Sequence, residues 1–198
     1  MATVLLARHG ETAWNRAGRL QGWAPTDLTD RGRAQARELA TAAAARDPDR
    51  LVASDLLRAR RTAERIGTAA DLPVGTDRRW RERDAGRLQG LDAAAVYDRF
   101  PRLSLADAGE DALRARPEGG ESLAAVRERV LDAWADLRAA LDPGATAVVV
   151  THAVPIDAVR AAATGWSFAA AVREGGPDPG GMLEVRIGED GPSVRDGP

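Results

Sequence analysis

The sequence is that of an α/β protein: it predicts a three-layer sandwich with a mostly parallel central sheet and helices on both faces. Short, β-branched apolar runs alternate with longer Ala-rich stretches, as in chains that alternate strands and helices. The runs are almost continuously apolar, which is typical of strands covered on both faces. With 198 residues, the chain has the size of one domain, and we expect a single domain over 1–198.

Five strands are expected from these apolar runs. The run at 3–7 leads directly into Arg8-His9-Gly10, and the run at 145–150 leads into Thr151-His152-Ala153. Ligands bind at the carboxyl ends of the strands in an open α/β sheet, so both histidines are predicted to stand at the ligand-binding edge. The other expected strands are 50–54, 73–76 and 182–187.

Helices are expected between the strands. Residues 31–46 follow Thr29 and residues 55–69 follow Ser54, and both preceding residues are of a type that caps helices. The clearest helical pattern covers 122–141, where apolar residues recur every three or four positions. These helices supply the two outer layers of the sandwich.

The second half of the chain carries a further helix, an insertion and a loop. Residues 155–164 place Pro155 in a first helical turn, where proline is tolerated, and Gly165 after the last turn. The weaker pattern at 91–120 predicts a small helical insertion over the carboxyl edge of the sheet. Residues 175–181 contain two prolines and predict a loop.

The residue types that are missing exclude several chemistries. The chain has no cysteine, which excludes disulfides, thiolate nucleophiles, iron–sulfur clusters and cysteine-ligated zinc. It also has no lysine, which excludes a Walker phosphate loop and Schiff-base catalysis. Only two histidines are present, so any imidazole chemistry depends on His9 and His152.

Charge and hydropathy indicate the surroundings in which the protein works. The net charge of −2 lacks the basic excess of nucleic-acid-binding proteins, so no nucleic acid is expected as a partner. No apolar run approaches the roughly 18 residues of a membrane span, and no membrane partner is expected. Residues 1–7 are uncharged and too short for the apolar region of a signal peptide, so we expect a cytoplasmic protein.

Arg8 and His9 are the first candidates for catalysis. An imidazole nitrogen supplies a lone pair that can attack phosphorus, while a neighbouring guanidinium neutralises the phosphoryl oxygens. Gly10 lets the backbone approach an anion closely. The alternative is a core histidine at a strand end, and the tripeptide alone does not decide between the two.

Two further segments carry candidate residues. Arg58 lies in the first turn of the helix expected at 55–69, near the positive end of the helix dipole, where an anion is favoured. In an extended segment, Glu82 points away from Arg81 and Arg83, whose charges would otherwise lower its pKa, and it can then donate a proton. Spacing alone does not select this carboxyl among the 30 acidic residues.

Taken together, these segments resemble the histidine phosphatase superfamily, which contains cofactor-dependent phosphoglycerate mutases and many small-molecule phosphatases. The resemblance extends over nearly the whole chain, with the motifs in the expected order. The motifs that carry it are RHGETAWN (8–15), GRLQGW (18–23), DLTDRG (27–32), SDLLRARRTA (54–63), RERDAGRLQG (81–90), PEGGES (117–122) and the strand-terminal His152.

The resemblance implies a role for each candidate. His9 is the expected nucleophile and becomes transiently phosphorylated, while Arg8, Arg58 and His152 line the pocket around the phosphoryl group. Glu82 protonates the leaving oxygen and then takes a proton from the attacking water. The expected substrate-binding residues are Arg8, Asn15, Gln21, Arg58, His152 and Ala153, the last of which stands where the family often has glycine.

These roles require particular protonation states. His9 must be neutral to attack, so we expect its other ring nitrogen to donate to a backbone carbonyl. His152 gains by being protonated beside a phosphoryl dianion, so the two histidines are expected to titrate differently. Guanidiniums and an acid offset the charge of the phosphoester without a metal ion, and neither a metal nor a cofactor is expected.

Three functions remain open. The first is a metal-independent phosphomonoesterase of the histidine acid phosphatase type, acting on small phosphorylated metabolites through a phosphohistidine. The second is a cofactor-dependent phosphoglycerate mutase; such enzymes usually have a longer insertion, a Tyr after the acid segment, a Lys and an Arg pair. Here Ala85 stands in the Tyr position, lysine is missing, and 101–117 carries only scattered arginines. The third is a non-catalytic module that binds phosphorylated ligands.

The expected substrate is an anionic phosphoester. Arg16, Arg19, Arg83 and Arg87 would give the mouth of the pocket a positive rim, which predicts substrates such as phosphoglycerate derivatives or sugar phosphates. The runs of Arg and Ala suit association into a homodimer, although the sequence does not decide the oligomeric state.

Overall fold

A mixed six-stranded sheet forms the centre of the molecule. The computed structural model describes residues 1–189 and 191–195. Within these ranges the strand order is β3-β2-β4-β1-β5-β6. The strands β3, β2, β4 and β1 are parallel, and β5 is antiparallel to both of its neighbours, β1 and β6. The strands are β1 (Ala2–Arg8), β2 (Arg50–Ala53), β3 (Val74–Thr76), β4 (Thr146–Thr151), β5 (Met182–Gly188) and β6 (Gly191–Arg195). The predicted mostly parallel sheet is confirmed, and β6 is an additional edge strand.

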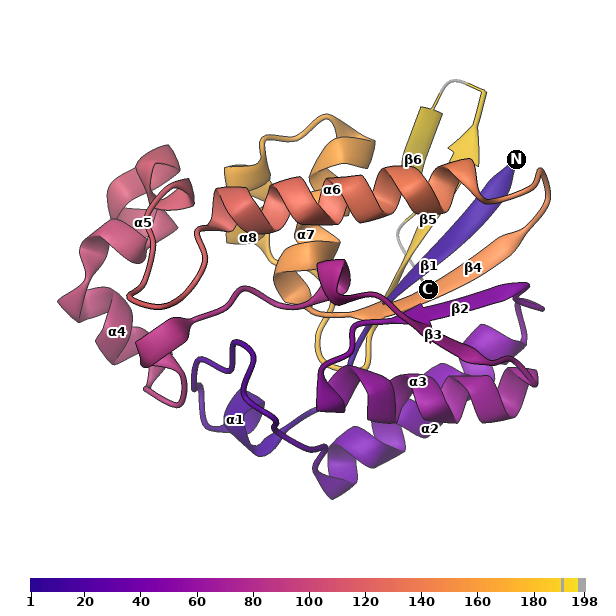
Figure 1. Cartoon of the computed structure of the whole chain (residues 1–198), viewed down its shortest axis with the longest axis horizontal. Coiled ribbons are helices and arrows are strands. Elements are labelled where there is room, and N and C mark those ends of the chain that lie inside the picture. The colour runs from indigo at the N-terminus through magenta and orange to yellow at the C-terminus, as the bar shows by residue number, and fades with distance from the viewer. Residues whose placement is uncertain (190, 196–198) are drawn as a thin grey trace.

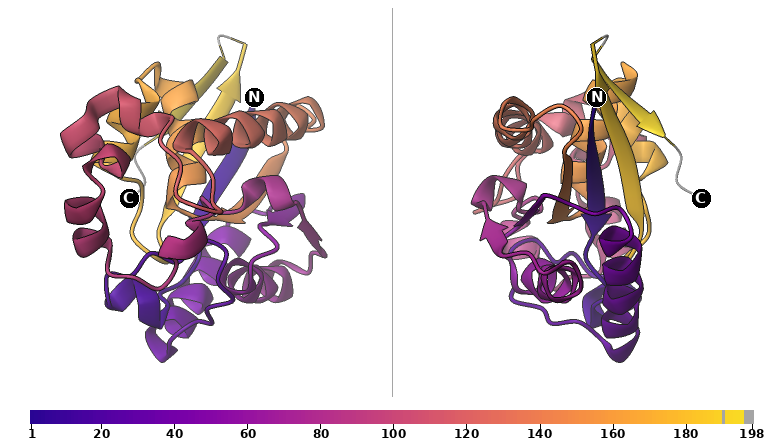
Figure 2. Two further views of the ribbon diagram at one scale, coloured as in Figure 1. Left: turned by 60° about the vertical axis from the view of Figure 1, so that its left-hand side comes forward. Right: turned by 90° about the vertical axis from the view of Figure 1, so that its right-hand side faces the viewer.

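Helices cover both faces of this sheet. Two of them, α2 and α3, lie on one face, and α6, α7 and α8 lie on the other (Figures 1 and 2). The helices are α1 (Ala13–Arg16), α2 (Asp30–Ala44), α3 (Leu57–Ala70), α4 (Ala93–Arg99), α5 (Leu105–Ala108), α6 (Leu123–Ala139), α7 (Ala153–Thr164) and α8 (Phe168–Glu174). The predicted three-layer sandwich is confirmed.

Alternation along the strands supplies the two apolar cores. On β1, Val4 and Leu6 pack into the core beneath α6 and α7, while Leu5 and Ala7 pack into the core beneath α2 and α3. All four side chains are fully buried. Because successive side chains of a strand point to opposite faces, a continuous apolar run fills both cores, as the sequence predicts.

One of the two predicted helix caps is confirmed. Thr29 caps α2 by accepting a hydrogen bond from the backbone N–H three residues on. Ser122, the first residue of the predicted helix at 122–141, caps α6 in the same way. The prediction that Ser54 caps α3 is wrong: the helix begins at Leu57 without a side-chain cap. The Ser54 hydroxyl instead lies 2.9 Å from Nε2 of His152, at the edge of the sheet.

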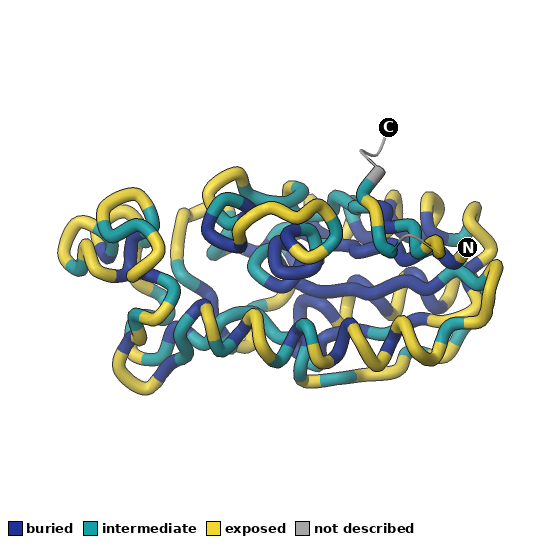
Figure 3. The backbone as a smooth tube through the Cα atoms, turned by 90° about the horizontal axis from the view of Figure 1, so that it is seen from above, coloured by how far each residue is buried: buried dark blue, intermediate teal, exposed yellow. Residues whose placement is uncertain are grey.

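The insertion at 91–120 is helical, as expected. It contains α4, α5 and two short 3-10 helices, η3 (Pro101–Leu103) and η4 (Gly109–Leu113). Seen from above, it stands at one end of the molecule and has few buried positions of its own (Figure 3). The segment 175–181 contains no helix or strand, in agreement with the predicted loop. No helix in the described ranges has the length and apolar character needed to cross a membrane.

Strand register brings the two histidines together. Arg8 pairs with Thr151 at the carboxyl ends of the neighbouring strands β1 and β4. The next residue on each strand is therefore His9 on one side and His152 on the other, and the His9 N–H donates to the Thr151 carbonyl at 3.1 Å. The β2 strand lies on the other side of β4, so Ser54, the residue after β2, lies at the same carboxyl edge of the sheet.

Candidate active site

The two imidazoles form the centre of the site. The ring centroids of His9 and His152 are 5.0 Å apart and the rings are tilted by 59°. His9 is 2% exposed and His152 is fully buried. Residues separated by most of the chain thus share one polar site at the carboxyl edge of the parallel strands.

The hydrogen bonds of His9 select its neutral form. Its Nδ1 donates to the Gly10 carbonyl at 2.8 Å, as expected from the sequence. Its Nε2 accepts from Nε of Arg58 at 3.1 Å and therefore carries a lone pair. Burial, followed by the charges of Arg58 and Arg8, holds the pKa of His9 well below its usual value of 6.5. Neutral His9 directs the lone pair of Nε2 toward Arg58.

His152 differs from what the sequence led us to expect. Burial is again the largest cause, followed by the charge of Arg58, and together they hold the pKa of His152 well below 6.5. The two histidines do not titrate in opposite directions, because both are buried among the same cations. Nε2 of His152 contacts Ser54, whereas its buried Nδ1 has no hydrogen-bond partner in the described part of the chain. Nδ1 is the ring nitrogen left to contact a bound anion.

Two arginines supply the positive charge. Arg58, in the first turn of α3, is 1% exposed and donates from Nη2 to the Gly22 carbonyl at 2.8 Å. Burial lowers the pKa of Arg58 to about 10. Arg8 donates from Nη1 to the Pro177 carbonyl at 2.9 Å, and its buried Nε has no partner among the described residues. In those residues, no group of three or more His, Asp or Glu side chains is arranged to hold a metal ion.

A cavity of about 580 Å³ opens onto this centre. Its lining contains the predicted site residues Arg8, His9, Asn15, Gln21, Arg58, Glu82 and Ala153. His152 is not part of the lining and lies behind it, against the ring of His9. The structure therefore brings all the predicted residues to one place, with His152 beside His9.

Asn15 and Gln21 are held by neighbouring hydroxyls. Asn15 and Thr12 form a reciprocal capping pair at the start of α1. Oε1 of Gln21 accepts from Oγ1 of Thr26 at 2.7 Å and lies 2.8 Å from Oγ1 of Thr12. The amide nitrogen of Gln21 is consequently the group that remains to donate at the cavity.

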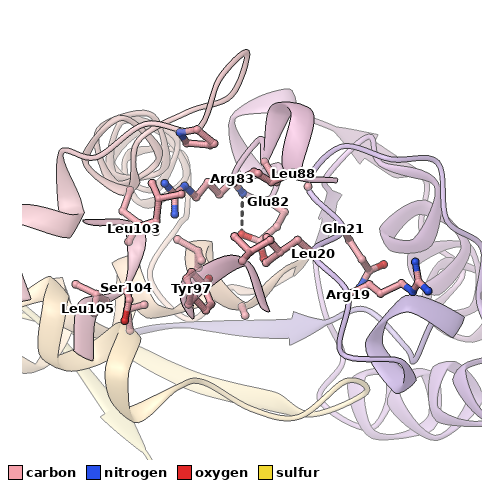
Figure 4. A pocket seen from close by; sticks show the side chains of 18 of the residues that line it. Arg19, Leu20, Gln21, Glu82, Arg83, Leu88, Tyr97, Leu103, Ser104 and Leu105 are labelled. Atoms are coloured by element: carbon pink, nitrogen blue, oxygen red, sulfur yellow. Dashed lines mark hydrogen bonds between the residues drawn. The ribbon is translucent and has the colours of Figure 1, made fainter. Parts of the chain in front are cut away.

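Glu82 lies between two short 3-10 helices, η1 (Arg78–Trp80) and η2 (Gly86–Leu88). Its Oε1 accepts from the backbone N–H of Arg83 at 2.7 Å. Arg81 points away and binds both carboxylate oxygens of Asp55 at 2.6 Å. Arg83, however, lines the same cavity as Glu82 (Figure 4). The prediction that Glu82 points away from both arginines is wrong for Arg83, because the flanking turns break the extended alternation.

Arg129, a residue without any sequence signal of a functional role, holds the Glu82 segment in place. From α6, its guanidinium donates to the carbonyls of Arg79 at 2.8 Å, Arg81 at 2.7 Å and Glu82 at 2.9 Å. It also binds both carboxylate oxygens of Glu121, at 3.0 and 2.8 Å. Burial opposes ionisation of Glu121, but its bonds to Arg129 prevail and lower its pKa overall. Arg129 therefore positions the segment without touching the cavity.

The predicted positive rim is present only in part. Arg19 and Arg83 line the cavity, whereas Arg16 and Arg87 do not. Arg87 pairs with Glu118 at 3.1 Å on the exposed surface. Surface pairs of this kind contribute little to binding or stability.

The chain matches the family model described as the histidine phosphatase superfamily (branch 1) over residues 4–196. It is 41% identical over 128 residues to a glucosyl-3-phosphoglycerate phosphatase of Mycolicibacterium vanbaalenii, a match that covers 65% of this chain and 56% of that protein. It is 34% identical over 174 residues to phosphoserine phosphatase 1 of Hydrogenobacter thermophilus, with 85% and 82% covered. It is also 37% identical over 160 residues to "Probable phosphoglycerate mutase GpmB" of Cronobacter sakazakii, with 79% and 72% covered.

A solved structure shares the fold over nearly the whole length. It is a mycobacterial glucosyl-3-phosphoglycerate phosphatase in complex with VO3, with a TM-score of 0.81 and 32% sequence identity. The superposition covers 98% of this chain and 96% of that one. The motifs, the fold and these relatives agree, and the chain belongs to branch 1 of the histidine phosphatase superfamily.

Proposed function

We propose that this protein is a metal-independent phosphomonoester hydrolase that acts on small phosphorylated metabolites through a phosphohistidine on His9. One observation carries the proposal: His9 is neutral, and its Nε2 lone pair faces the buried guanidinium of Arg58. A histidine that only fills the core would not be expected to have a buried guanidinium at Nε2, because burying a cation without an anion costs free energy. An anion bound between the two side chains would offset that cost. Relatives named as phosphatases of small metabolites support the same conclusion.

The first step transfers the phosphoryl group to the protein. The Nε2 lone pair of His9 attacks phosphorus, and the bond from phosphorus to the leaving oxygen breaks. The N–H at Nε of Arg58 then donates its hydrogen bond to a phosphoryl oxygen and no longer to Nε2 of His9. Arg8 and His152 donate hydrogen bonds to the same phosphoryl group. Glu82, as a carboxylic acid, gives its proton to the leaving oxygen, so the product departs as an alcohol.

The second step returns the enzyme to its starting state. A water molecule attacks phosphorus, and the Glu82 carboxylate takes one of its protons. The bond between phosphorus and Nε2 breaks, its electron pair returns to His9, and inorganic phosphate leaves. Asn15 and Gln21 bind the phosphoryl oxygens, and Ala153, at the start of α7, offers its backbone N–H to the same group.

A phosphoglycerate mutase is the second candidate, because one relative carries that name. Against it, the chain has no lysine and Ala85 lines the cavity where a tyrosine would be expected from the family resemblance. A non-catalytic phosphate-binding module is the third, and it fits poorly with a complete set of catalytic residue types.

Two assays separate these candidates. The purified protein is incubated with p-nitrophenyl phosphate in the presence of a metal chelator, and separately with 3-phosphoglycerate while 2-phosphoglycerate is monitored. The phosphatase releases phosphate from the aryl ester despite the chelator. Fast interconversion of phosphoglycerates without phosphate release identifies the mutase, and phosphate binding without turnover identifies the module. Either of the last two results refutes the proposal.

We further propose a single domain, a cytoplasmic location and a soluble substrate, with neither nucleic acid nor a membrane as partner. The net charge of −2 supports the exclusion of nucleic acid. We also propose that the chain forms a homodimer, which is tested by light scattering after size-exclusion chromatography: the mass of a single chain would contradict it.

A further inference from the structure

We propose that Arg83 binds a carboxylate carried on the leaving group of the substrate, so that the enzyme selects carboxylate-bearing phosphomonoesters. The inference rests on the proposed phosphatase function. It assigns a specificity role to a residue that the chemistry of phosphoryl transfer does not use.

The cavity has room for more than a phosphoryl group. Its volume of about 580 Å³ lies in the range of about 300–1,000 Å³ typical of sites for whole small molecules. Glu82 must reach the leaving oxygen, so the leaving group occupies the part of the cavity beyond Glu82. Arg83 is the next residue along the chain and lines that part, together with Leu103 and Ser104 of the insertion (Figure 4).

The guanidinium of Arg83 is held in place by neutral partners. Its Nε donates to the Glu121 carbonyl at 2.8 Å and its Nη2 donates to the Ala115 carbonyl at 3.0 Å. Its Nη1 donates to no acceptor in the part of the chain that the structure describes. A fixed guanidinium with one nitrogen left free is preorganised to bind an oxyanion, because little side-chain entropy is lost on binding.

The charge of Arg83 is not neutralised by an ion pair in the described residues. The nearest acidic groups are otherwise engaged: Glu82 accepts from the backbone N–H of Arg83, and the Glu121 carboxylate is bound by Arg129. The hydroxyl of Tyr97 also lies near enough to act on the charge. Burial is the largest influence and lowers the pKa of Arg83. A partly desolvated cation without a carboxylate is an unfavourable arrangement that an anionic ligand would relieve.

The neighbouring arginines show the contrast. Arg81 donates to both carboxylate oxygens of Asp55, and Arg87 pairs with Glu118 on the surface. Along this one segment, the arginine that lines the cavity is the one without a carboxylate partner among the described residues. The cavity around it has apolar walls from Leu88, Val96, Leu103 and Leu105, which strengthen an ionic contact by excluding water.

Two substrates that differ mainly in the carboxylate test the proposal. The values of kcat/KM for 3-phosphoglycerate and for glycerol 3-phosphate are measured with the wild-type protein, Arg83→Gln and Arg83→Lys. We expect the wild type to prefer 3-phosphoglycerate, and Arg83→Gln to lower the ratio of the two values about 10- to 100-fold, the worth of one charge-assisted hydrogen bond. Arg83→Lys keeps the charge and retains part of the preference. Arg87→Gln, on the same segment, leaves the ratio unchanged.

The outcomes that overturn the proposal are distinct. An Arg83→Gln protein that loses activity equally on both substrates, with the ratio unchanged, shows that Arg83 only supports the Glu82 segment. A wild type that hydrolyses both esters without preferring the carboxylate refutes the inference but leaves the phosphatase function standing. A wild type that hydrolyses neither these esters nor p-nitrophenyl phosphate refutes both. If Arg83→Gln does not fold, as judged by circular dichroism, the ratio of the two kcat/KM values for Arg83→Lys decides. An unchanged wild-type ratio would show that the guanidinium of Arg83 does not bind the carboxylate.

Discussion

The floor and the wall of the cavity are built in different ways. The floor consists of Arg8, His9, Arg58 and His152, which sit at strand ends or in the first turn of a helix directly after a strand. Backbone pairing between parallel strands fixes their spacing, and three of the four are at most 2% exposed. The wall consists of 81–120, which has no strand and only short helices. The comparison indicates that the sheet fixes the residues around the phosphoryl group, whereas short elements hold the proposed acid, Glu82, and the proposed specificity residue, Arg83.

The largest effect is expected on the floor, from His9→Asn. Without the attacking lone pair, kcat should fall by a factor on the order of 10⁶, as for the loss of other catalytic nucleophiles. Turnover of p-nitrophenyl phosphate measures the effect, and Arg16→Gln, which lies near the site but outside the cavity lining, is the matched control. Residual activity within a hundredfold of the wild type would show that His9 is not the nucleophile.

Arg58→Gln should produce the next largest loss. It removes a buried charge that His9 and the transferring phosphoryl group share, and the loss of one preorganised donor typically costs about 10²–10³ in kcat. Arg61→Gln is the control on the same helix, because Arg61 is exposed and pairs with Glu64 at the surface. Equal activities of the two variants would contradict the assignment of Arg58 to the floor.

Arg129→Gln tests how the wall is tied to the floor. The loss of its bonds to the Glu82 segment should misplace the acid, so hydrolysis of an alkyl ester should fall about 10-fold, a part of the roughly 10²–10⁴-fold that general acid catalysis contributes. Hydrolysis of p-nitrophenyl phosphate should fall less, because its leaving group needs no proton. Arg127→Gln, exposed on the same helix, is the control. Equal losses on both esters would indicate a structural role alone.

The buried imidazoles also predict a pH dependence of stability. The pKa of His9 is lowered in the folded protein, whereas in the unfolded chain it lies near 6.5. The unfolded chain therefore binds more protons below about pH 6.5, and the free energy of unfolding falls as the pH decreases, by up to about 1.4 kcal/mol per pH unit for each histidine. Urea unfolding between about pH 7 and 5 should show a shallower decline for His9→Asn. Parallel declines would contradict the buried, neutral state.

The residues of the floor were predictable because they follow short apolar runs and local motifs that can be recognised in the sequence. Apolar runs that end in His9 and His152 predict strands whose ends meet, and the order of the motifs supplies Arg58. Two details escaped prediction. Serine is a common helix cap, but the hydroxyl of Ser54 contacts His152 at the end of the neighbouring strand and does not cap α3. The edge strand β6 is short and contains Pro192, which weakens any strand pattern.

The wall was less predictable because its contacts join distant segments through single side chains. Arg129 lies on a helix whose apolar stripe gives no sign of a role for its polar positions. The motif at 117–122 contained the one relevant signal, Glu121, but nothing in the sequence pairs it with Arg129. Arg83 was predicted at the mouth of the pocket, but alternation separated it from Glu82, whereas the 3-10 turns on either side redirect the chain and bring both side chains to the cavity. The short helices α1 and α8 offer too few residues for a periodic pattern.

The phosphoryl acceptor is the most direct test of a catalytic floor fixed by the sheet. Wild-type protein is mixed with a phosphoester labelled at phosphorus, quenched with alkali within the first turnover, and digested for peptide mapping. The label should appear on the peptide that contains His9, should be released by acid, and should be missing from His9→Asn. Label on any other residue, or product formation from wild-type protein that never carries label, would contradict the mechanism.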